Sequence, residues 1–325
     1  MVDFERILVT GGAGFIGSHL IDAIFEGNLA EEVLVVDNLS SGDVGFIKGW
    51  LDSGKARLVR VDLRDLEETE GVIRGVDVVF HFAANPEVRK GSEDPSTMWA
   101  NNVIATYNVL EAMRKNDVPH IVFASSSTVY GEPEKIPTPE DYGPLEPIST
   151  YGASKLAGEA WISAYAHTYG IKGLVLRFAN IIGPRLRHGV IYDFIVKLLR
   201  NPSELEILGD GTQRKSYLFV GDAVDATLHL LEHQLRTGER VGFYNVGNDD
   251  WVTVKEIADI VSKVMGVSPK YNFTGGVEGG RGWKGDVKYM LLDISKLKGT
   301  GWSPKYSSNQ AVEKTTVSLI KEIVG

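Results

Sequence analysis

Short runs of apolar, mostly β-branched residues alternate with amphipathic stretches through the first half of the chain. Runs of this length, bounded by turn residues, are typical of strands buried on both faces of a parallel sheet. Between them, apolar residues recur with a helical period, as in NNVIATYNVLEAMRKN and YGASKLAGEAWISAYAHTYG. The apolar runs read RILVTGG, EVLVVDN, ARLVRVDL, VDVVFHFAA, HIVFASSS and GLVLRFAN.

This alternation predicts an α/β fold, a Rossmann-like doubly wound parallel sheet with right-handed crossovers. We expect residues 1–180 to form the Rossmann domain. The regularity weakens after this point, and residues 181–325, which contain Gly-rich loops, are expected to form a smaller C-terminal substrate-binding lobe. The strand FYNVGN lies within residues 217–248, a segment expected to return to the main sheet, so the lobe is discontinuous in sequence.

The turn after the first strand carries three regularly spaced glycines, Gly11, Gly14 and Gly17, in TGGAGFIGSHL. Such glycines permit a tight turn, close approach of a pyrophosphate and close helix–strand packing, with the phosphates facing the helix N-terminus. Asp37 ends the second strand, where a carboxylate accepts hydrogen bonds from ribose hydroxyls and repels a 2′-phosphate. No Arg follows it directly, so the sequence favours NAD over NADP as cofactor.

Composition narrows the functional classes. The 325 residues carry a net charge of −9 and lack a basic cluster, which argues against nucleic acid or an anionic membrane as partner. No apolar run reaches the roughly 18 residues that span a bilayer, and we expect a cytoplasmic protein. The chain has no Cys, which excludes disulfides and thiolate zinc sites. His229 and His233 are four apart without a Glu base between them, and we predict no metal site.

The segment TYGASK places Tyr151 and Lys155 one helical turn apart. An unperturbed Tyr titrates near ~10, and a neighbouring cation lowers that value by roughly 1–3 units. The spacing therefore predicts a phenol made acidic enough by Lys155 to act as a general base.

The motifs TGGAGFIG, HFAA, SSSTVYG, YGASK and RFANIIGPR, in this order, make the chain resemble an extended short-chain dehydrogenase/reductase of the nucleotide-sugar branch, most similar to the UDP-glucose 4-epimerases (UDP-galactose 4-epimerases). The resemblance covers the whole chain and implies an NAD-using isomerase. Its reaction is epimerisation at C4 of a UDP-hexose, UDP-glucose or UDP-galactose, through a transient 4-keto sugar. The implied catalytic set is Ser126, Tyr151 and Lys155.

The resemblance also assigns contacts to cofactor and substrate. It implies that NAD touches the turn glycines, the ends of several strands and the catalytic pair, and that the UDP-sugar is held by basic residues of the C-terminal lobe. The implied NAD contacts are Gly11, Gly14, Phe15, Ile16, Gly17, Asp37, Asn38, Ser41, Gly42, Asp62, Leu63, Phe82, Ala83, Ala84, Asn101, Tyr151, Lys155 and Phe178. The implied substrate contacts are Ser126, Tyr151, Asn180, Val190, Arg214, Lys215 and Arg281.

The chain departs from its relatives at some of these places. Pro86 stands where bacterial-type epimerases usually have a Lys that contacts the cofactor, and Lys215 replaces an Arg, which removes a bidentate fork. Related dehydratases have Asp-Glu where this chain has Ser127 and Thr128, and decarboxylases a Glu at the second position. Elimination therefore lacks its acid/base pair, which favours an epimerase over a dehydratase or decarboxylase.

Other readings stay open at this stage. Activity on N-acetylated or glucuronate UDP-sugars depends on side chains expected near Tyr289 and Met290. A non-catalytic NAD-sensing protein on the same fold is a further alternative. The resemblance also implies a homodimer, in which two long helices, residues 99–115 and 152–169, pair with their symmetry mates.

Overall fold

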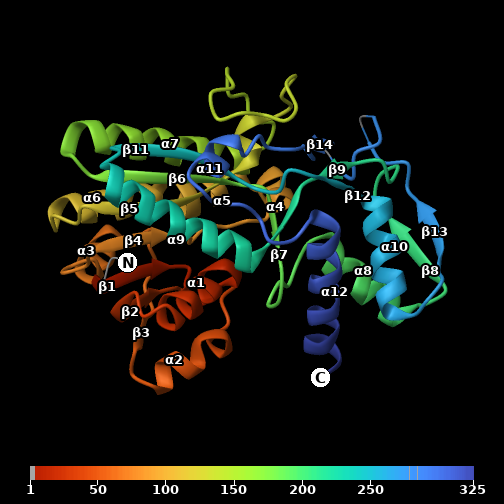
Figure 1. The fold of residues 1–325 in the computed structure, drawn as a ribbon, viewed down its shortest axis with the longest axis horizontal. Coiled ribbons are helices and arrows are strands. Elements are labelled where there is room, and N and C mark those ends of the chain that lie inside the picture. Colours follow the sequence, from red (N-terminus) through yellow and green to blue (C-terminus); the bar gives the residue numbers. More distant parts are fainter. Residues whose placement is uncertain (1–3, 278, 284) are drawn as a thin grey trace. The chain divides into compact units, whose positions relative to one another are not determined.

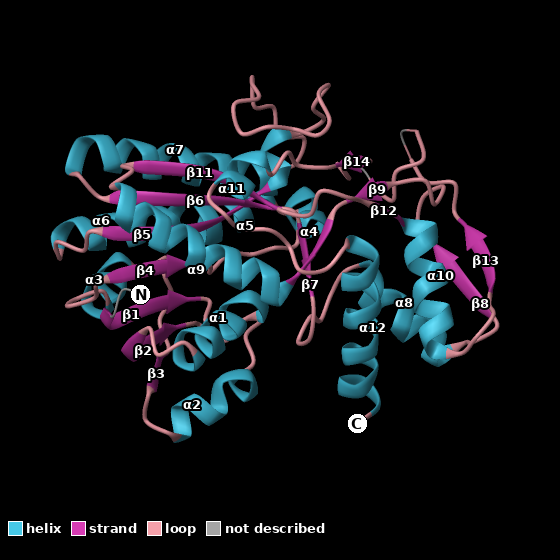
Figure 2. Ribbon diagram, in the orientation of Figure 1, coloured by secondary structure: helices cyan, strands magenta, loops and turns pink. Residues whose placement is uncertain are grey.

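The computed structural model describes residues 4–277, 279–283 and 285–325. Its main sheet has seven strands in the order β11-β6-β5-β4-β1-β2-β3 (Figure 2). The pairs β1–β2, β2–β3, β1–β4 and β4–β5 are parallel. The order reverses beside β1, as in dinucleotide-binding folds, so the predicted fold class is confirmed. The strands are β1 (Phe4–Thr10), β2 (Ala30–Val36), β3 (Ala56–Val59), β4 (Val78–His81), β5 (His120–Ser126), β6 (Lys172–Phe178) and β11 (Val241–Val246).

Helices cover both faces of this sheet (Figure 1). One face carries α3 (Leu66–Val72), α6 (Ala105–Lys115) and α7 (Thr150–Tyr169), whose apolar side chains form a continuous core with those of the strands. The other face carries α1 (Phe15–Glu26) and α9 (Val220–Thr237). Leu8, Val79 and Val175 are fully buried, which explains why the strands read as near-continuous apolar runs.

The expected long helix over residues 99–115 is not uniform. Its first part, η2 (Trp99–Ile104), is a π-helix, and regular α-helix follows only in α6. π-helical turns are rare and recur at functional sites, and η2 contains the predicted cofactor contact Asn101. The remaining short helices between the strands are η1 (Val44–Ile47), α2 (Lys48–Asp52), α4 (Val88–Glu93), α5 (Pro95–Met98) and η3 (Ser127–Tyr130).

The C-terminal half contains small sheets and a group of packed helices. Strand β9 lies between β12 and β14, β10 pairs with β7, and β13 pairs with β8. Helices α8, α10 and α12 pack against one another. The elements are β7 (Asn180–Ile182), α8 (Val190–Arg200), β8 (Glu204–Ile207), β9 (Arg214–Lys215), β10 (Tyr217–Phe219), β12 (Val252–Thr253), α10 (Val254–Met265), β13 (Lys270–Phe273), β14 (Tyr289–Met290), α11 (Ser295–Gly299) and α12 (Ser308–Val324).

The chain divides into two compact units. Unit 1 consists of residues 1–129, 149–177 and 224–244, and unit 2 of residues 130–148, 178–223 and 245–325. Each unit is discontinuous in sequence. Among the residues that the structure describes, no helix combines the length and the apolar character needed to cross a bilayer.

Candidate active site

The three predicted catalytic residues lie together in unit 1. Ser126 is the last residue of β5, and its side chain lies close enough to the Tyr151 phenol to lower the pKa of that phenol. Helix α7 begins at Thr150 because Ser149 caps it, with the Ser149 side chain accepting from the Gly152 backbone N–H at 3.0 Å. The helix thus already includes Tyr151, which is held one turn before Lys155.

Lys155 is almost fully buried, with 3% of its surface exposed. Its ammonium donates a hydrogen bond to the Ala124 carbonyl oxygen on β5 at 2.7 Å. The same ammonium lies 4.9 Å from the ring centre of Phe123 and 5.9 Å from that of Tyr151. The Lys155 ammonium therefore lies beside the Tyr151 ring, as the spacing predicts. Its hydrogen bond to the Ala124 carbonyl of β5 holds it in this position.

The prediction that the pKa of Tyr151 is lowered is wrong for this structure. Burial raises the pKa of Tyr151 to about 12, although the hydrogen bond from Ser126 acts in the opposite direction. Burial also lowers the pKa of Lys155 to about 7, against the attraction of Glu159. Both shifts have the same cause, because low-dielectric surroundings penalise whichever form is charged. The i, i+4 spacing indicates the neighbouring charge, but desolvation appears only when the folded chain buries both groups.

The glycine turn has the close packing that the motif predicts. Gly11 has φ +67° and its backbone N–H bonds to the Val36 carbonyl at 2.8 Å. A Cβ on Gly11 would lie 2.8 Å from the Ala83 nitrogen, and one on Gly17 would lie 2.3 Å from the Gly11 oxygen. Gly14 is the N-cap of α1, and Phe15 and Ile16, both half-buried, open the helix. The turn therefore has no room for side chains at Gly11 and Gly17. A pyrophosphate could approach its backbone closely at the N-terminus of α1.

Asp37 lies at the end of β2 with 9% of its surface exposed. Its carboxylate accepts from the Ala13 N–H at 3.1 Å and the Leu39 N–H at 2.8 Å, and burial raises its pKa. Leu39 has φ +60°, an uncommon conformation for a bulky side chain that the Asp37 bond supports. Gly42 approaches so closely that a Cβ would lie 3.0 Å from the Asp37 carboxylate.

Asn38 and Ser41 follow Asp37 on the same loop. The Asn38 side chain accepts from the Ser40 N–H at 3.0 Å, and Ser41 is exposed. An arginine that sequence spacing did not reveal also reaches this loop, since Arg60 donates from Nε to the Asn38 carbonyl at 3.3 Å. The signal was hidden because Arg60 follows the next strand, β3, rather than Asp37 itself.

The other predicted cofactor contacts follow β3 and β4, end β6 or lie in η2. Asp62 pairs with Arg64 at 2.5 Å, which lowers its pKa, while the Leu63 carbonyl accepts from Asn108 at 2.8 Å. Asn101 donates to the Thr97 carbonyl at 2.9 Å. Phe82, Ala83 and Ala84 are half-buried after β4, and Phe178 is the buried last residue of β6.

A buried histidine, His81, connects the ends of neighbouring strands. Sequence reasoning did not identify this residue as part of the site. His81 hydrogen-bonds the hydroxyls of Thr10 at 2.8 Å and Thr106 at 3.0 Å. The Thr10 hydroxyl in turn accepts from the Phe82 and Ala83 N–H groups, each at 3.1 Å. Burial lowers the pKa of His81 to about 3, so the ring is neutral at physiological pH.

The predicted substrate contacts outside the catalytic set all belong to unit 2. Asn180, on β7, donates to the Ser216 carbonyl at 3.1 Å, and Val190 is the first residue of α8. The basic residues already have acidic or aromatic neighbours. Arg214 lies over the Trp251 ring, Lys215 pairs with the buried Asp286 at 2.6 Å, and Arg281 pairs with Glu132. A diphosphate bound by these cations would compete with those carboxylates.

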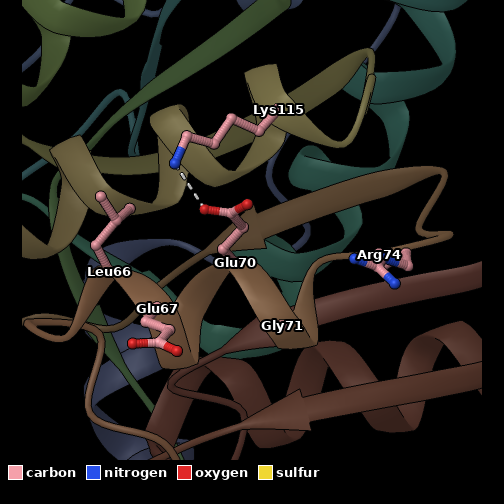
Figure 3. Close-up of a pocket in the computed structure, with 6 residues that line it drawn as sticks. All are labelled: Leu66, Glu67, Glu70, Gly71, Arg74 and Lys115. Carbon is pink, nitrogen blue, oxygen red and sulfur yellow. Dashed lines mark hydrogen bonds and ion pairs between the residues drawn. The ribbon is translucent and has the colours of Figure 1, made fainter.

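A surface hollow of unit 1 carries none of the predicted site residues (Figure 3). Leu66, Glu67 and Glu70 line it from α3, and Lys115 reaches in from α6 to pair with Glu70 at 2.7 Å. Because none of the predicted cofactor contacts lines this hollow, it is not a candidate for the cofactor site.

Comparison with known proteins identifies the family. The model of the NAD dependent epimerase/dehydratase family matches residues 7–247. A putative UDP-glucose 4-epimerase of Methanocaldococcus jannaschii is 38% identical, over 95% of this chain and 96% of that protein. UDP-glucuronic acid decarboxylase 5 of Arabidopsis thaliana is 33% identical, over 92% of this chain and 85% of that protein.

A solved structure agrees with this result. The crystal structure of a UDP-galactose 4-epimerase is similar with a TM-score of 0.88 and 50% identity, over 98% of this chain and 99% of that one. The chain thus resembles this epimerase along nearly its whole length. It also has the fold, the glycine turn and the Ser-Tyr-Lys arrangement described above. The chain therefore belongs to the NAD dependent epimerase/dehydratase family of enzymes.

Proposed function

We propose that the chain is a UDP-glucose 4-epimerase, which inverts C4 of UDP-glucose or UDP-galactose with NAD as bound cofactor. The observation that carries this proposal is the assembly of the half-buried Ser126 and Tyr151 with the buried Lys155 at the junction of β5 and α7. The relatives named UDP-glucose and UDP-galactose 4-epimerase support the choice of sugar.

The geometry of these three residues supports the following roles. Tyr151 takes the proton of the sugar 4-hydroxyl, and Ser126, whose side chain lies near the phenol, donates a hydrogen bond to the same oxygen. Lys155 holds a positive charge beside the phenol and stabilises its ionised form. NAD held by the Gly11–Gly17 turn and Asp37 would supply a reversible hydride acceptor for C4 of the sugar.

We infer that unit 1 holds NAD. The Gly11–Gly17 turn leaves room for a pyrophosphate beside the α1 N-terminus, and the Asp37 carboxylate is placed to accept from the adenosine ribose. Asp37 also disfavours a 2′-phosphate, despite the nearby Arg60. We propose the remaining predicted contacts of unit 1, together with Phe178, the last residue of β6, for the adenine, ribose and nicotinamide.

We propose that unit 2 anchors the UDP moiety through Asn180, Val190, Arg214, Lys215 and Arg281. Lys215 and Arg281 supply positive charge for the diphosphate if Asp286 and Glu132 release them. The anchoring leaves the hexose free to turn, which inversion at C4 through a planar keto group requires. Near the proposed sugar-selecting positions, Tyr289 is 44% exposed and Met290 is 7% exposed.

Decarboxylation and dehydration are the competing activities within the family. The hydroxyl of Thr128 donates to Ser126 at 3.0 Å, and no carboxylate stands at this position or at Ser127. A hydroxyl does not supply the acid/base chemistry that elimination needs, so this contact favours epimerisation.

The test is to incubate the purified protein with UDP-galactose without added NADH and to identify the product. The proposal predicts UDP-glucose. A 4-keto-6-deoxy sugar nucleotide would identify a dehydratase instead, and no turnover of UDP-galactose, UDP-N-acetylgalactosamine or UDP-glucuronate would favour a non-catalytic NAD-binding role.

We also propose a homodimer, formed through α6 and α7. These helices carry a row of aromatic side chains, in which Tyr107 and Trp161 are 5.5 Å apart and Tyr165 and Tyr169 are 5.0 Å apart. Trp161 is 41% exposed and Tyr169 is 53% exposed. Large exposed aromatic patches mark interaction surfaces, and pairing with a second copy would make a four-helix bundle.

A further inference from the structure

Helix α7 carries a buried acid that the proposed chemistry does not use. Glu159 is 2% exposed and lies one turn after Lys155, as Lys155 lies one turn after Tyr151. Its carboxylate accepts from Arg177 of β6, with Nη2 at 2.8 Å and Nε at 3.0 Å, and from the Ser125 hydroxyl at 2.5 Å. Arg177 is itself 4% exposed.

Tyr151, Lys155 and Glu159 lie on one face of α7, and the end of β5 contacts all three. The Ala124 carbonyl accepts from Lys155, the Ser125 hydroxyl donates to Glu159, and the next side chain, Ser126, lies near the Tyr151 phenol. The acid is therefore fixed in the same frame as the base and its lysine, so their relative positions are set by one strand and one helix.

The charges alternate along this frame. Arg177 is positive, Glu159 negative and Lys155 positive, and Tyr151 becomes negative when it acts as a base. The four charges then sum to zero, which is the least costly way to keep ionised groups in a low-dielectric interior. Without Glu159 the interior would hold two cations, Arg177 and Lys155, that repel each other.

The other groups that face Lys155 do not replace Glu159. His81 of β4 is close enough for the lysine charge to disfavour its protonation, and it is neutral because burial lowers its pKa to about 3. Phe123 presents only a ring face, and Ala124 only a carbonyl dipole. Glu159 is the negative charge that raises the pKa of Lys155 against burial.

We propose that Glu159 is a positioning residue that keeps Lys155 protonated, and that Arg177 and Ser125 hold its carboxylate in place for this task. The importance of that charge for turnover rests on the proposed function. The electrostatic effect on Lys155 does not, which allows the two to be tested separately.

The first test measures Lys155 directly, without substrate. The protein is labelled with 13C at the lysine side chains, the Lys155 signal is assigned from its absence in Lys155→Met, and its pH titration is followed by NMR. In Glu159→Gln the titration midpoint should fall by roughly one pH unit, because an opposite charge nearby has been removed. An unchanged or higher midpoint would overturn the proposal.

Two further variants separate charge from shape. Glu159→Asp keeps the negative charge and should restore most of the midpoint. Glu32→Gln is the matched control, since Glu32 pairs with Arg6 at 2.7 Å on the outer part of the sheet, and it should leave the Lys155 titration unchanged.

A double variant tests the effect on Lys155 even if Glu159→Gln fails to fold. If Glu159→Gln does not fold because Arg177 is left unpaired, the double variant Glu159→Gln/Arg177→Met removes both charges. It should fold and still show a lowered Lys155 midpoint, by less than the single variant, because the repelling cation is also gone. A midpoint equal to that of the unmodified protein would contradict the proposal.

The second test uses the pH dependence of kcat/KM for UDP-galactose. Removing a negative charge lowers the proton affinity of both Lys155 and Tyr151, so both limbs of the profile should move to lower pH in Glu159→Gln and return in Glu159→Asp. A lower rate with unmoved limbs would indicate a purely structural role. If the unmodified enzyme does not turn over this sugar, the proposed function fails while the NMR titration still decides the role of Glu159.

Discussion

At the scale of single residues, burial is the strongest influence on the proposed catalytic pair. It raises the pKa of Tyr151 and lowers that of Lys155, so the ionised pair depends on each partner stabilising the other. Tyr151 is a base only when deprotonated, and activity should therefore rise as pH rises through its pKa.

Lys155→Met removes the cation beside this phenol and should move the rising limb of the pH–rate profile upward by roughly 1–3 units, because phenolate loses its nearest positive charge. The profile of kcat measures this shift. Lys115→Met is the control, since Lys115, the last residue of α6, pairs with Glu70 of α3 and not with the phenol. A rising limb that stays in place in Lys155→Met would show that the lysine does not set the acidity of the phenol.

Asp37→Ala tests the proposed ribose contact. It should weaken NAD binding by about 1 to 3 kcal/mol, the usual worth of a hydrogen bond to a charged group, as measured by calorimetric titration. Asp65→Ala is a suitable control because Asp65 caps α3 by accepting from the Glu68 N–H and is not placed in the cofactor site. Equal NAD affinity in Asp37→Ala and the unmodified protein would show that Asp37 does not contact the cofactor.

At the scale of elements, the turn from β1 to α1 is the most tightly packed part of the proposed cofactor site. Gly17→Ala would place a Cβ 2.3 Å from the Gly11 oxygen, and the helix would have to shift. We expect a loss of about 1 to 3 kcal/mol in unfolding free energy, measured by denaturant titration, together with weaker NAD binding. Gly49→Ala in α2 meets no atom within 4 Å and should be neutral or slightly stabilising. Full stability in Gly17→Ala would mean that the turn is looser than described.

The elements show what the sequence can and cannot predict. The strands of unit 1 were predictable because both faces of a parallel sheet are buried, so β1 and β6 read as apolar runs. The π-helix over Trp99–Ile104 was not, since its apolar spacing is that of an ordinary helix and its shape depends on tertiary bonds such as Asn102 to Ser154 at 2.9 Å. Local pattern fixes the type of an element, and distant contacts fix its details.

The site itself was predictable only in part. The spacing of Tyr151 and Lys155 places them on one helix face, but the acceptor of Lys155 is a backbone carbonyl of β5, 31 residues away. The partner of Lys215, Asp286, is 71 residues away, and no local signal indicates it. Residue types predict the chemistry of a site, whereas ion pairs and desolvation arise only when the chain folds.

At the scale of the whole molecule, the dimer proposed through α6 and α7 predicts a mass twice that of the 35.6 kDa chain in light scattering at micromolar concentration. Trp161→Glu should shift the mass toward that of the monomer, because a charge in an aromatic interface is desolvated without a partner. Val317→Glu, at an exposed apolar position of α12, should leave the mass unchanged. A monomer mass for the unmodified protein would contradict the proposal.

The most direct test of the account is the turnover of Tyr151→Phe with UDP-galactose. The substitution removes one hydroxyl, so affinities for NAD and for UDP, measured by calorimetry, should stay close to those of the unmodified protein. We predict that kcat falls by roughly 10²- to 10⁴-fold, the usual contribution of a general base. Near-normal epimerisation by Tyr151→Phe would show that another group takes the proton, and it would contradict the role assigned to the Tyr151–Lys155 pair.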